Sequence, residues 1–300
     1  MPAPASALPV SATPAGSVFM IGPKPEGIAV DPVTGLVAVG LHAPDSVALT
    51  DRDGRLVRRV PLPAAPRHLR FAAPGGPLVA PAEAARRLVL VDVPGREIAA
   101  EVPVGRQPHD AVAIGSRYFV GNELSDSVSV IEGDRVVATL AAPQQPGGLA
   151  ADGMLAVIGV RSRKLQVYDA VALQPLASAA AGVEPTHVVW AADRLYVADT
   201  QGEAVLVFST QPRPELIGRV ALAGAPYGLA LDAQRKHLWV TLTASSTLVE
   251  LDVSTPATRK LAMLPAVRQP NGVAVDPATG TVYVTGTAAG ELQVIKPPAG

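Results

Sequence analysis

The chain has 300 residues, of which 48% are hydrophobic and 4% aromatic, and its formal net charge is −1. A nearly neutral chain without a run of lysines or arginines gives no electrostatic reason to expect nucleic acid or an anionic membrane surface as a partner. The absence of cysteine excludes disulfides and thiolate metal sites, and no apolar stretch approaches the roughly 18 residues that suggest a membrane span. Thirty prolines and 27 glycines disfavour long helices and favour short strands joined by turns.

The first sixteen residues, MPAPASALPVSATPAG, are rich in Pro, Ala and Ser. They have neither the charged segment nor the sustained apolar segment of a secretory signal peptide. We expect residues 1–16 to form a flexible tail. The alternative, that a signal peptide was removed and Met1 was added for expression, stays open at this point.

An alternating apolar pattern recurs along the rest of the chain, each time directly after a proline. The recurring prolines are Pro25, Pro66, Pro108, Pro146, Pro185, Pro226 and Pro270. Their separations of 41, 42, 38, 39, 41 and 44 residues exceed those of ankyrin, tetratricopeptide and leucine-rich repeats. Each unit contains an inner strand directly after the proline, as in EGIAVD (26–31), and then further short apolar runs separated by turns. Four short antiparallel strands per unit is the pattern of a propeller blade.

This pattern predicts an all-β fold, a seven-bladed β-propeller of four-stranded blades. Six units have all four predicted strands, whereas the seventh ends after its third strand at KPPAG (296–300). The segment SVFMIG, Ser17 to Gly22, precedes the first inner strand and is expected to supply the missing outer strand. That pairing would close the ring and protect strand edges that an open array exposes. Residues 17–300 are therefore predicted to form a single propeller domain.

Units such as QPNGVAVDPATGTVYVTGTAAGELQVIK (269–296) and EPTHVVWAADRLYVADTQGEAVLVFS (184–209) resemble YVTN-type β-propeller repeats, which are close to the NHL type and to the YncE-like bacterial proteins. The resemblance covers residues 17–296. It does not extend to WD40 repeats, because neither a Trp-Asp dipeptide nor a Gly-His pair recurs. The resemblance implies an extracytoplasmic binding protein, periplasmic or secreted. More distant seven-bladed relatives include sugar lactonases and a streptogramin lyase.

Polar residues are predicted to gather at one end of the central channel. Because adjacent strands run antiparallel, the residues that follow each recurring proline and those at the end of each second strand should lie at the same level. Loops and strand ends on a rigid scaffold commonly carry function. The polar residues at these positions are Glu26, His42, Arg67, His68, Glu83, His109, Asp110, Asn122, Glu123, Arg161, Thr186, His187, Asp199, Tyr227 and Asn271.

Three of the five histidines occupy equivalent positions at this channel end, with carboxylates nearby. Imidazole nitrogen suits zinc, copper, iron or nickel, and an imidazole with a carboxylate can act as an acid and base pair. The candidate ligands of a divalent metal are His68, His109 and His187. The candidate catalytic residues are His68, Asp110 and His187. The opposing interpretation is that polar side chains near a water-filled channel bond exposed blade edges.

Other polar and aromatic residues have a structural interpretation. Arg70 departs from the alanines found at this inner-strand position in four other units. We expect it to pair with a neighbouring carboxylate, and the alternative is that it reaches the channel. Trp190 and Trp239 are expected in the core. Residues expected to satisfy the backbone groups of turns are Asn122 and Asp199, at the Asn position of the YVTN signature, and Asp51, Asp92, Asp169 and Asp252.

The leading functional interpretation is a binding or interaction protein that presents the polar channel end to a small ligand, a glycan or another protein. No phosphate-binding loop, dinucleotide fingerprint, nucleophile elbow or H-E-x-x-H motif is present. The candidate ligand-binding residues are Glu26, Arg67, His109, Glu123, Arg161, Tyr227 and Asn271. The alternative is a metal-dependent hydrolase or lyase, similar to the lactonases, that uses the histidine-rich channel end. Whether the protein is an enzyme stays open. We expect a monomer. We do not expect nucleic acid as a partner, because the sequence lacks the basic groove with stacking aromatics that binds single strands.

Overall fold

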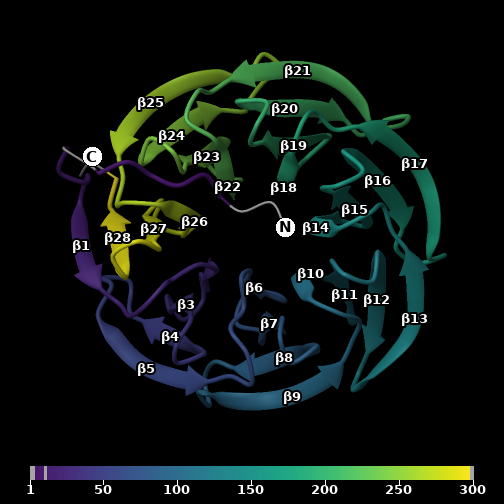
Figure 1. Ribbon diagram of the computed structural model, residues 1–300, viewed down its shortest axis with the longest axis horizontal. Helices are drawn as coiled ribbons and strands as arrows, with labels where there is room; N and C mark the ends of the chain where they lie inside the picture. The colour runs from purple at the N-terminus through teal and green to yellow at the C-terminus, as the bar shows by residue number, and fades with distance from the viewer. Residues whose placement is uncertain (1–3, 10–11, 298–300) are drawn as a thin grey trace.

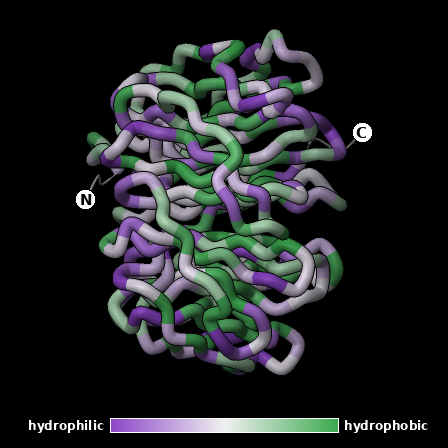
Figure 2. Tube along the Cα trace, turned by 90° about the vertical axis from the view of Figure 1, so that its right-hand side faces the viewer, coloured by the Kyte–Doolittle hydropathy of each residue, from purple (hydrophilic) through white to green (hydrophobic). Residues whose placement is uncertain are grey.

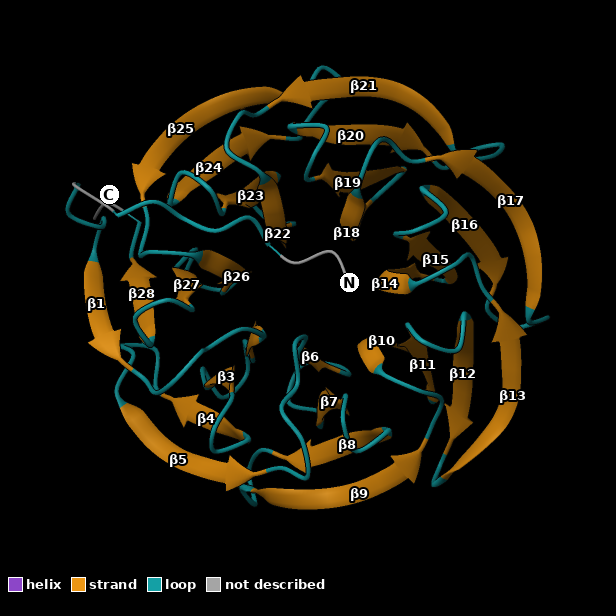
Figure 3. Cartoon of the chain, viewed as in Figure 1, coloured by secondary structure: helices purple, strands orange, loops and turns teal. Residues whose placement is uncertain are grey.

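Short β-strands, 28 in all, make up the regular structure of this protein in a computed structural model that describes residues 4–9 and 12–297. The strands form seven four-stranded antiparallel sheets arranged in a ring around a central axis (Figures 1 and 3). This arrangement confirms the predicted seven-bladed propeller. In the part of the chain that the structure describes, no helix has the length and apolar character needed to cross a membrane.

Each sheet is a blade whose four strands run outward from the axis in chain order, with one exception at the ring closure. The innermost strands of blades 1 to 7 are β2 (Ile28–Val30), β6 (Arg70–Phe71), β10 (Pro108–Ile114), β14 (Pro146–Asp152), β18 (Pro185–Ala191), β22 (Pro226–Asp232) and β26 (Pro270–Val275). The second strands are β3 (Val37–Leu41), β7 (Leu78–Ala82), β11 (Arg117–Asn122), β15 (Met154–Gly159), β19 (Arg194–Asp199), β23 (His237–Leu242) and β27 (Val282–Gly286). The third strands are β4 (Ser46–Thr50), β8 (Arg87–Asp92), β12 (Ser127–Glu132), β16 (Lys164–Asp169), β20 (Ala204–Ser209), β24 (Thr247–Asp252) and β28 (Glu291–Ile295). The outer strands are β5 (Leu56–Pro61), β9 (Glu97–Pro103), β13 (Arg135–Ala141), β17 (Gln174–Ala180), β21 (Glu215–Ala221), β25 (Arg259–Pro265) and, in blade 7, β1 (Ser17–Met20).

The two ends of the chain meet in blade 7. Strand β1 pairs antiparallel with β28, and the register runs from Ser17 opposite Val294 to Met20 opposite Glu291. Directly after β1, Ile21 is 1% exposed and packs in the cluster between blades 7 and 1. The expected closure by the N-terminal strand is therefore confirmed, and it protects the edge of β28 that would otherwise be free to pair with another chain.

The hydrophobic core is divided among the interfaces between blades. Seven clusters of buried residues occur in the described chain, each joining two neighbouring blades, and they consist mainly of Val, Leu, Ala and Ile. Both faces of the inner strands are covered in this way, which explains their nearly continuous apolar sequence. The outer strands instead alternate between exposed and half-buried residues, as β13 does. Figure 2 shows the resulting mixture of apolar and hydrophilic segments from the side.

The recurring proline marks a fixed connection between the start of an inner strand and the end of the second strand. In blades 3 to 7 the backbone carbonyl of the residue before the proline accepts a hydrogen bond from the residue that follows the second strand, for example from Glu123 N to Gln107 O at 2.9 Å. The residue after the proline then lies in a β-bulge, as between Pro108 and Asp110. A bulge re-aims a side chain, and here it does so at the channel end where the inner strands begin.

Glycine near the start of an inner strand permits neighbouring blades to approach closely around the axis. A Cβ atom on Gly272 would lie 2.3 Å from the carbonyl oxygen of Glu26, and one on Gly27 would lie 2.8 Å from that of Arg67. Both distances are shorter than atoms tolerate, so a larger residue would push the blades apart. The narrow channel end therefore depends on these glycines.

Deletion of residues 1–22 should destabilise the whole ring, because it removes β1 and Ile21 and leaves the edge of β28 unpaired. Truncation of one buried isoleucine alone costs about 2–5 kcal/mol, so the free energy of unfolding in a denaturant titration should fall by at least that amount. Deletion of residues 1–11 is the matched control, since it leaves β1 intact, and it should cost about 1 kcal/mol from lost hydrogen bonds. Equal effects of the two deletions would contradict closure by β1.

Candidate functional site

The central channel contains a cavity of ≈ 550 Å³ that runs along the inner strands. We call the end where the inner strands begin the start end, and the opposite end the far end. Residues at the far end that line the cavity include Ala73 and Pro74, which are exposed. At the start end, by contrast, Tyr227 is 8% exposed and Asn271 7% exposed. The cavity therefore opens to solvent at the far end and is closed at the start end.

A network of ion pairs crosses the start end from blade 1 to blade 3. The Nε2 atom of His42 lies 2.9 Å from an oxygen of Glu26, and Arg67 Nε lies 3.7 Å from the same carboxylate. Arg67 Nε also lies 3.4 Å from Glu83, whose other oxygen is 2.7 Å from His109 Nδ1. We call the six residues of this network the polar plug: Glu26, His42, Arg67, Glu83, His109 and Glu123.

The network continues on both sides of the polar plug. Glu123 lies 3.9 Å from His109 Nδ1 and accepts a hydrogen bond of 3.4 Å from the side chain of Gln145 in blade 4. On the other side, Asn271 of blade 7 donates to Glu26 at 3.3 Å. The start end is thus bridged by polar side chains of five blades.

The segment before β1 lies over this closed end. Gln269 bonds the backbone of Ala5 and Ala7 at 2.7 Å each, and its side-chain nitrogen also donates to Asn271. Figure 1 shows this segment crossing from β1 toward the axis. The predicted flexible tail, residues 1–16, lies partly outside the described residues; of the described part, Ala15 N also donates to Pro265 O at 2.9 Å.

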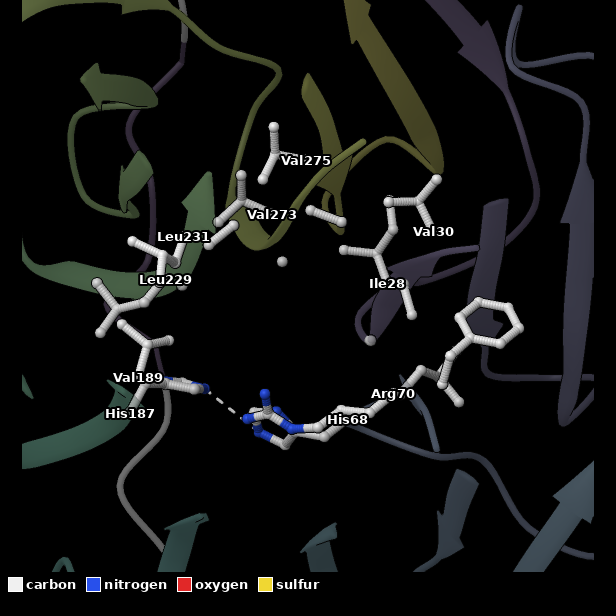
Figure 4. A pocket seen from close by; sticks show the side chains of 18 of the residues that line it. Ile28, Val30, His68, Arg70, His187, Val189, Leu229, Leu231, Val273 and Val275 are labelled. Carbon is white, nitrogen blue, oxygen red and sulfur yellow. Dashed lines mark hydrogen bonds between the residues drawn. The ribbon is translucent and has the colours of Figure 1, made fainter. Parts of the chain in front are cut away.

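Three histidines and a tyrosine lie next to one another across the channel, and all of them except His109 lie on the cavity side of the polar plug. The ring centroids are 4.7 Å apart for His68 and His109, 4.8 Å for His68 and His187, and 4.3 Å for His187 and Tyr227. The Nε2 atoms of His68 and His187 are 3.2 Å apart, as the dashed line in Figure 4 marks. These two imidazoles form the floor of the cavity, and we call them the histidine pair.

The two members of the histidine pair are held uncharged. Burial lowers the pKa of His187 to about 3, and the neighbouring His109 adds to this effect. Burial likewise places the pKa of His68 well below its ordinary value, against the opposing charge of Asp110. In a neutral pair one Nε2 donates and the other accepts. Protonation of either would place a charge in a buried site whose neighbouring carboxylate, Asp110, is already paired with Arg70.

In the polar plug, by contrast, the pKa shifts favour the charged forms. Burial acts to lower the pKa of His109, but the hydrogen bond to Glu83 and the charge of Glu123 raise it above its ordinary value. Burial acts to raise the pKa of Glu26, but His42 and Arg67 lower it. The plug is therefore a set of mutually compensating charges.

Half-buried Arg70 and buried Asp110 form a second ion pair beside the histidine pair. Nε and Nη2 of Arg70 lie 3.3 Å and 3.1 Å from the two oxygens of Asp110, which is 1% exposed. Arg70 also donates to Leu149 O, and Leu149 N donates to Asp110 at 2.9 Å. Burial acts to raise the pKa of Asp110, but Arg70 lowers it well below its ordinary value. This pair joins blades 2, 3 and 4 and confirms the predicted pairing of Arg70.

Buried polar atoms without a hydrogen-bond partner concentrate in this region. They are Arg67 Nε, Glu123 Oε2 and His187 Nδ1, and the others in the described chain belong to Asn122 and Ser246. Arg67 Nε is within ion-pair distance of Glu83, but the geometry is not that of a hydrogen bond. Since buried polar groups normally have a hydrogen-bond partner, this concentration of unpaired atoms at one end of the channel is unusual.

Most of the residues predicted to converge at one channel end do so. Glu26, Arg67, His109, Glu123 and Asn271 belong to the network at the start end or contact it, and His68, His187 and Tyr227 lie directly beneath it. Arg161 instead lies exposed in the turn after β15. Whether any of these residues binds a ligand stays a prediction.

The candidate catalytic and metal-ligating residues are near one another but already engaged. Asp110 faces Arg70, and His109 Nδ1 faces Glu83. Within residues 4–9 and 12–297, no group of three or more His, Asp and Glu side chains is arranged to hold a metal ion. The histidine pair alone supplies two nitrogens close together.

Turn and core predictions are confirmed with two corrections. The carboxylates of Asp51, Asp92, Asp169, Asp199 and Asp252 accept hydrogen bonds from the backbone N–H groups of turns. Asn122 instead donates to the hydroxyls of Ser127 and Ser129, because its strand pairs it with β12. Trp239 is buried as predicted, whereas Trp190 is only half-buried: it packs against the core cluster between blades 4 and 5 and also lines the cavity.

The apolar wall of the cavity was missed by reasoning from sequence. Its residues come from β2, β18, β22 and β26: Ile28, Val30, Val189, Leu229, Leu231, Val273 and Val275 (Figure 4). These residues read as ordinary core, because the inner strands are apolar on both faces. Alternation within a strand could not have found them, because residues on both faces of a strand line the channel, as Ala230 does between Leu229 and Leu231.

Comparison with known proteins gives the fold and no more. No family model and no curated protein matches the chain. Solved structures that it resembles include hydrazine synthase of Kuenenia stuttgartiensis, with 16% identity, a TM-score of 0.81 and coverage of 97% of this chain and 99% of that one. A chain of the mitotic checkpoint complex has 15% identity, a TM-score of 0.81 and coverage of 99% and 97%. The Cps50 (Swd1) β-propeller domain of Myceliophteria thermophila has 11% identity, a TM-score of 0.79 and coverage of 94% and 99%.

Removing the counter-ion of the buried Asp110 should be costly. Replacement of Arg70 by Met leaves the carboxylate of Asp110 buried without its counter-ion, which should reduce the free energy of unfolding by about 3–5 kcal/mol. The double variant Arg70→Met with Asp110→Asn should recover part of this loss. Arg87→Met, which breaks the half-exposed pair with Glu101, is the control and should cost at most about 1 kcal/mol. A loss for Arg70→Met as small as that of the control would show that Asp110 finds compensation elsewhere.

The histidine pair should make stability depend on pH below about 6.5. An unfolded histidine takes up a proton near pH 6.5, whereas His187 in the folded protein does so only near pH 3. Its stabilising contribution is therefore complete above pH 6.5 and is lost as the pH falls, at up to about 1.4 kcal/mol per pH unit for each such group. His187→Gln should reduce the slope of unfolding free energy against pH between 6.5 and 5 by about that amount.

Denaturant titrations at several pH values measure this slope. Comparing slopes removes any pH-independent loss of stability that the substitution itself causes. An unchanged slope in His187→Gln would mean that His187 already gains its proton in the folded protein in this range.

Proposed function

We propose that this protein is a β-propeller that binds a small molecule in its central channel, entering from the far end. The observation that carries the proposal is the ≈ 550 Å³ cavity, which is open at one end and closed at the other by the polar plug. Cavities of about 300–1,000 Å³ with mostly apolar walls and a few polar groups are typical of small-molecule sites. A glycan or a protein partner receives less support, since both would need a wide contact surface rather than the inside of a channel.

The polar plug has a structural and positioning role in this proposal. Its carboxylates and cations compensate one another's charge, and Gln269 joins the segment around Ala7 to Asn271 beside them. Ligand contacts are therefore expected at the histidine pair and the apolar wall rather than at Glu26, Glu123 or Arg161.

The alternative of a metal-dependent hydrolase or lyase has less support. Asp110 is neutralised by Arg70 and bonded to the backbone, so it does not offer a base to a substrate. Such a reaction would also need a third ligand beside the histidine pair. We further propose, from the residue pattern of units such as 269–296, that the repeats are of the YVTN type and that the protein acts outside the cytoplasm.

The test is displacement of an apolar dye from the channel. N-phenyl-1-naphthylamine, an uncharged dye whose fluorescence rises in apolar surroundings, should bind saturably to the wild-type protein, and ligands from a small-molecule library should displace it. Val273→Phe, which fills part of the cavity, should weaken dye binding at least about tenfold, equivalent to 1.4 kcal/mol.

Val171→Phe is the matched control, because Val171 is 78% exposed in a turn on the outside. It should leave dye binding unchanged. Absence of saturable binding, or equal binding by wild type and Val273→Phe, would overturn the proposal.

A further inference from the structure

The guanidinium of Arg70 has one edge that is not engaged by the protein. Its Nε and Nη2 atoms face the two oxygens of Asp110, and Nη2 also donates to Leu149 O, whereas Nη1 has no hydrogen-bond partner among the described residues. No atom of Arg70 is among the buried polar atoms that lack a partner, so Nη1 is accessible. Arg70 lines the cavity, and its side chain is 36% exposed. The guanidinium therefore holds one edge against Asp110 and turns another toward the channel.

The other two charged residues that line the cavity, Glu26 and Arg67, are compensated within the polar plug. Glu26 faces both His42 and Arg67, and Arg67 lies within ion-pair distance of Glu83 as well. As a whole, the polar plug sets three carboxylates against three basic side chains. Glu26 and Arg67 are also less exposed than Arg70, at 16% and 24%. A charged ligand in the cavity is therefore expected to meet Arg70 first.

His68 supplies a second donor beside Arg70. His187 Nδ1 is buried without a hydrogen-bond partner, and a buried N–H without an acceptor is rarer than a buried acceptor without a donor. This favours the tautomer in which His187 carries its proton on Nε2 and donates to His68 Nε2, 3.2 Å away. Neutral His68 then carries its own proton on Nδ1. Within the described part of the chain, that atom has no hydrogen-bond partner and is not one of the buried unpaired atoms, so it is an accessible donor.

The two donors project from the same side of one inner segment. His68 and Arg70 are two positions apart in extended chain, so their side chains point the same way from Cα atoms about 7 Å apart, while Leu69 between them is buried. Figure 4 shows both side chains ending together near the centre of the channel. The position of Arg70 is Ala in four of the other blades and Val in two. Blade 2 alone therefore places a cation here.

We propose that the channel binds a small organic acid and holds its carboxylate between Arg70 Nη1 and His68 Nδ1. This inference rests on the proposed function and specifies its ligand class. A planar carboxylate matches the planar guanidinium, and hydrogen bonds between charged groups are the stronger kind. A guanidinium that also faces Asp110 compensates no more than one further negative charge, so the ligand is a monocarboxylate rather than a phosphate. The rest of the acid occupies the cavity toward the far end.

Two compounds with one carbon skeleton test the ligand class. Cyclohexanecarboxylate and cyclohexanecarboxamide share the ring and carry planar groups of similar size, but only the carboxylate is charged. Each is titrated into the full-length protein in a calorimeter, at neutral pH and in a buffer without other carboxylates. The carboxylate should bind at least about tenfold more tightly than the amide, because only the carboxylate is a charged partner for Arg70.

A substitution of Arg70 locates the bound carboxylate. Arg70→Lys keeps a cation opposite Asp110 but lacks the planar fork that serves Asp110 and the ligand at once, so the preference for the carboxylate should fall to about twofold or less. Arg87→Lys is the matched control, because Arg87 pairs with Glu101 of the outer strand β9, away from the channel. It should keep the full preference of the wild-type protein.

Two substitutions of His68 test the second donor. His68→Asn places an amide group near the position of Nδ1, whereas His68→Gln places it near the position of Nε2. Affinity for cyclohexanecarboxylate should therefore fall several-fold further in His68→Gln than in His68→Asn. A purely structural role would give the opposite order, because His68→Gln is the variant that can still accept the hydrogen bond from His187.

The outcomes distinguish the two proposals. If the wild-type protein binds the carboxylate no more tightly than the amide, or if Arg70→Lys keeps the preference, the ligand class assigned here is wrong. Saturable binding of N-phenyl-1-naphthylamine that Val273→Phe weakens would then still support binding in the channel. If neither the dye nor either cyclohexane compound binds, the proposed function fails as well.

Discussion

Closure of the ring by β1 is the constraint on which the rest of this structure depends. A blade cannot bury both faces of its own sheet, so each relies on two neighbours, and the hydrophobic cluster between blades 7 and 1 exists only when the circle is complete. The pairing of Ser17–Met20 with β28 completes it between the first and last segments of the chain. The channel, the polar plug and the cavity are all consequences of this closed geometry.

The fold could be predicted from the sequence because its signals are local and repeated. Seven prolines at spacings near forty residues, the alternating strands after each, and six complete units plus two fragments determined the blade number and the closure. The same register argument located the polar residues at one channel end. Periodicity predicts the fold reliably here because both faces of every blade must pack against a neighbouring blade.

The details of the site could not be predicted in this way. Register places His68 and His187 at equivalent positions, but it cannot tell that their Nε2 atoms meet at 3.2 Å across the channel from blades 2 and 5. Nor could it tell that Glu83 and Glu123 would neutralise His109, which depends on the bulges after the prolines. The apolar wall was missed because a valine that lines a cavity and one that fills a core have the same sequence signature. Its existence depends on how far opposite blades stand apart, which no local pattern reports.

The connections at the recurring prolines have a consequence for how this molecule can change over time. At the start end, backbone hydrogen bonds such as that from Glu123 N to Gln107 O join the beginning of the inner strand to the end of the second strand. None of these hydrogen bonds involves the residues where the inner strands end. Replacement of Leu231, Val275 or Trp190 would thus reshape the opening while the fastened side keeps the blades in register. The start end of the channel therefore tolerates few substitutions, whereas substitutions at the far end can change which ligands the channel accepts.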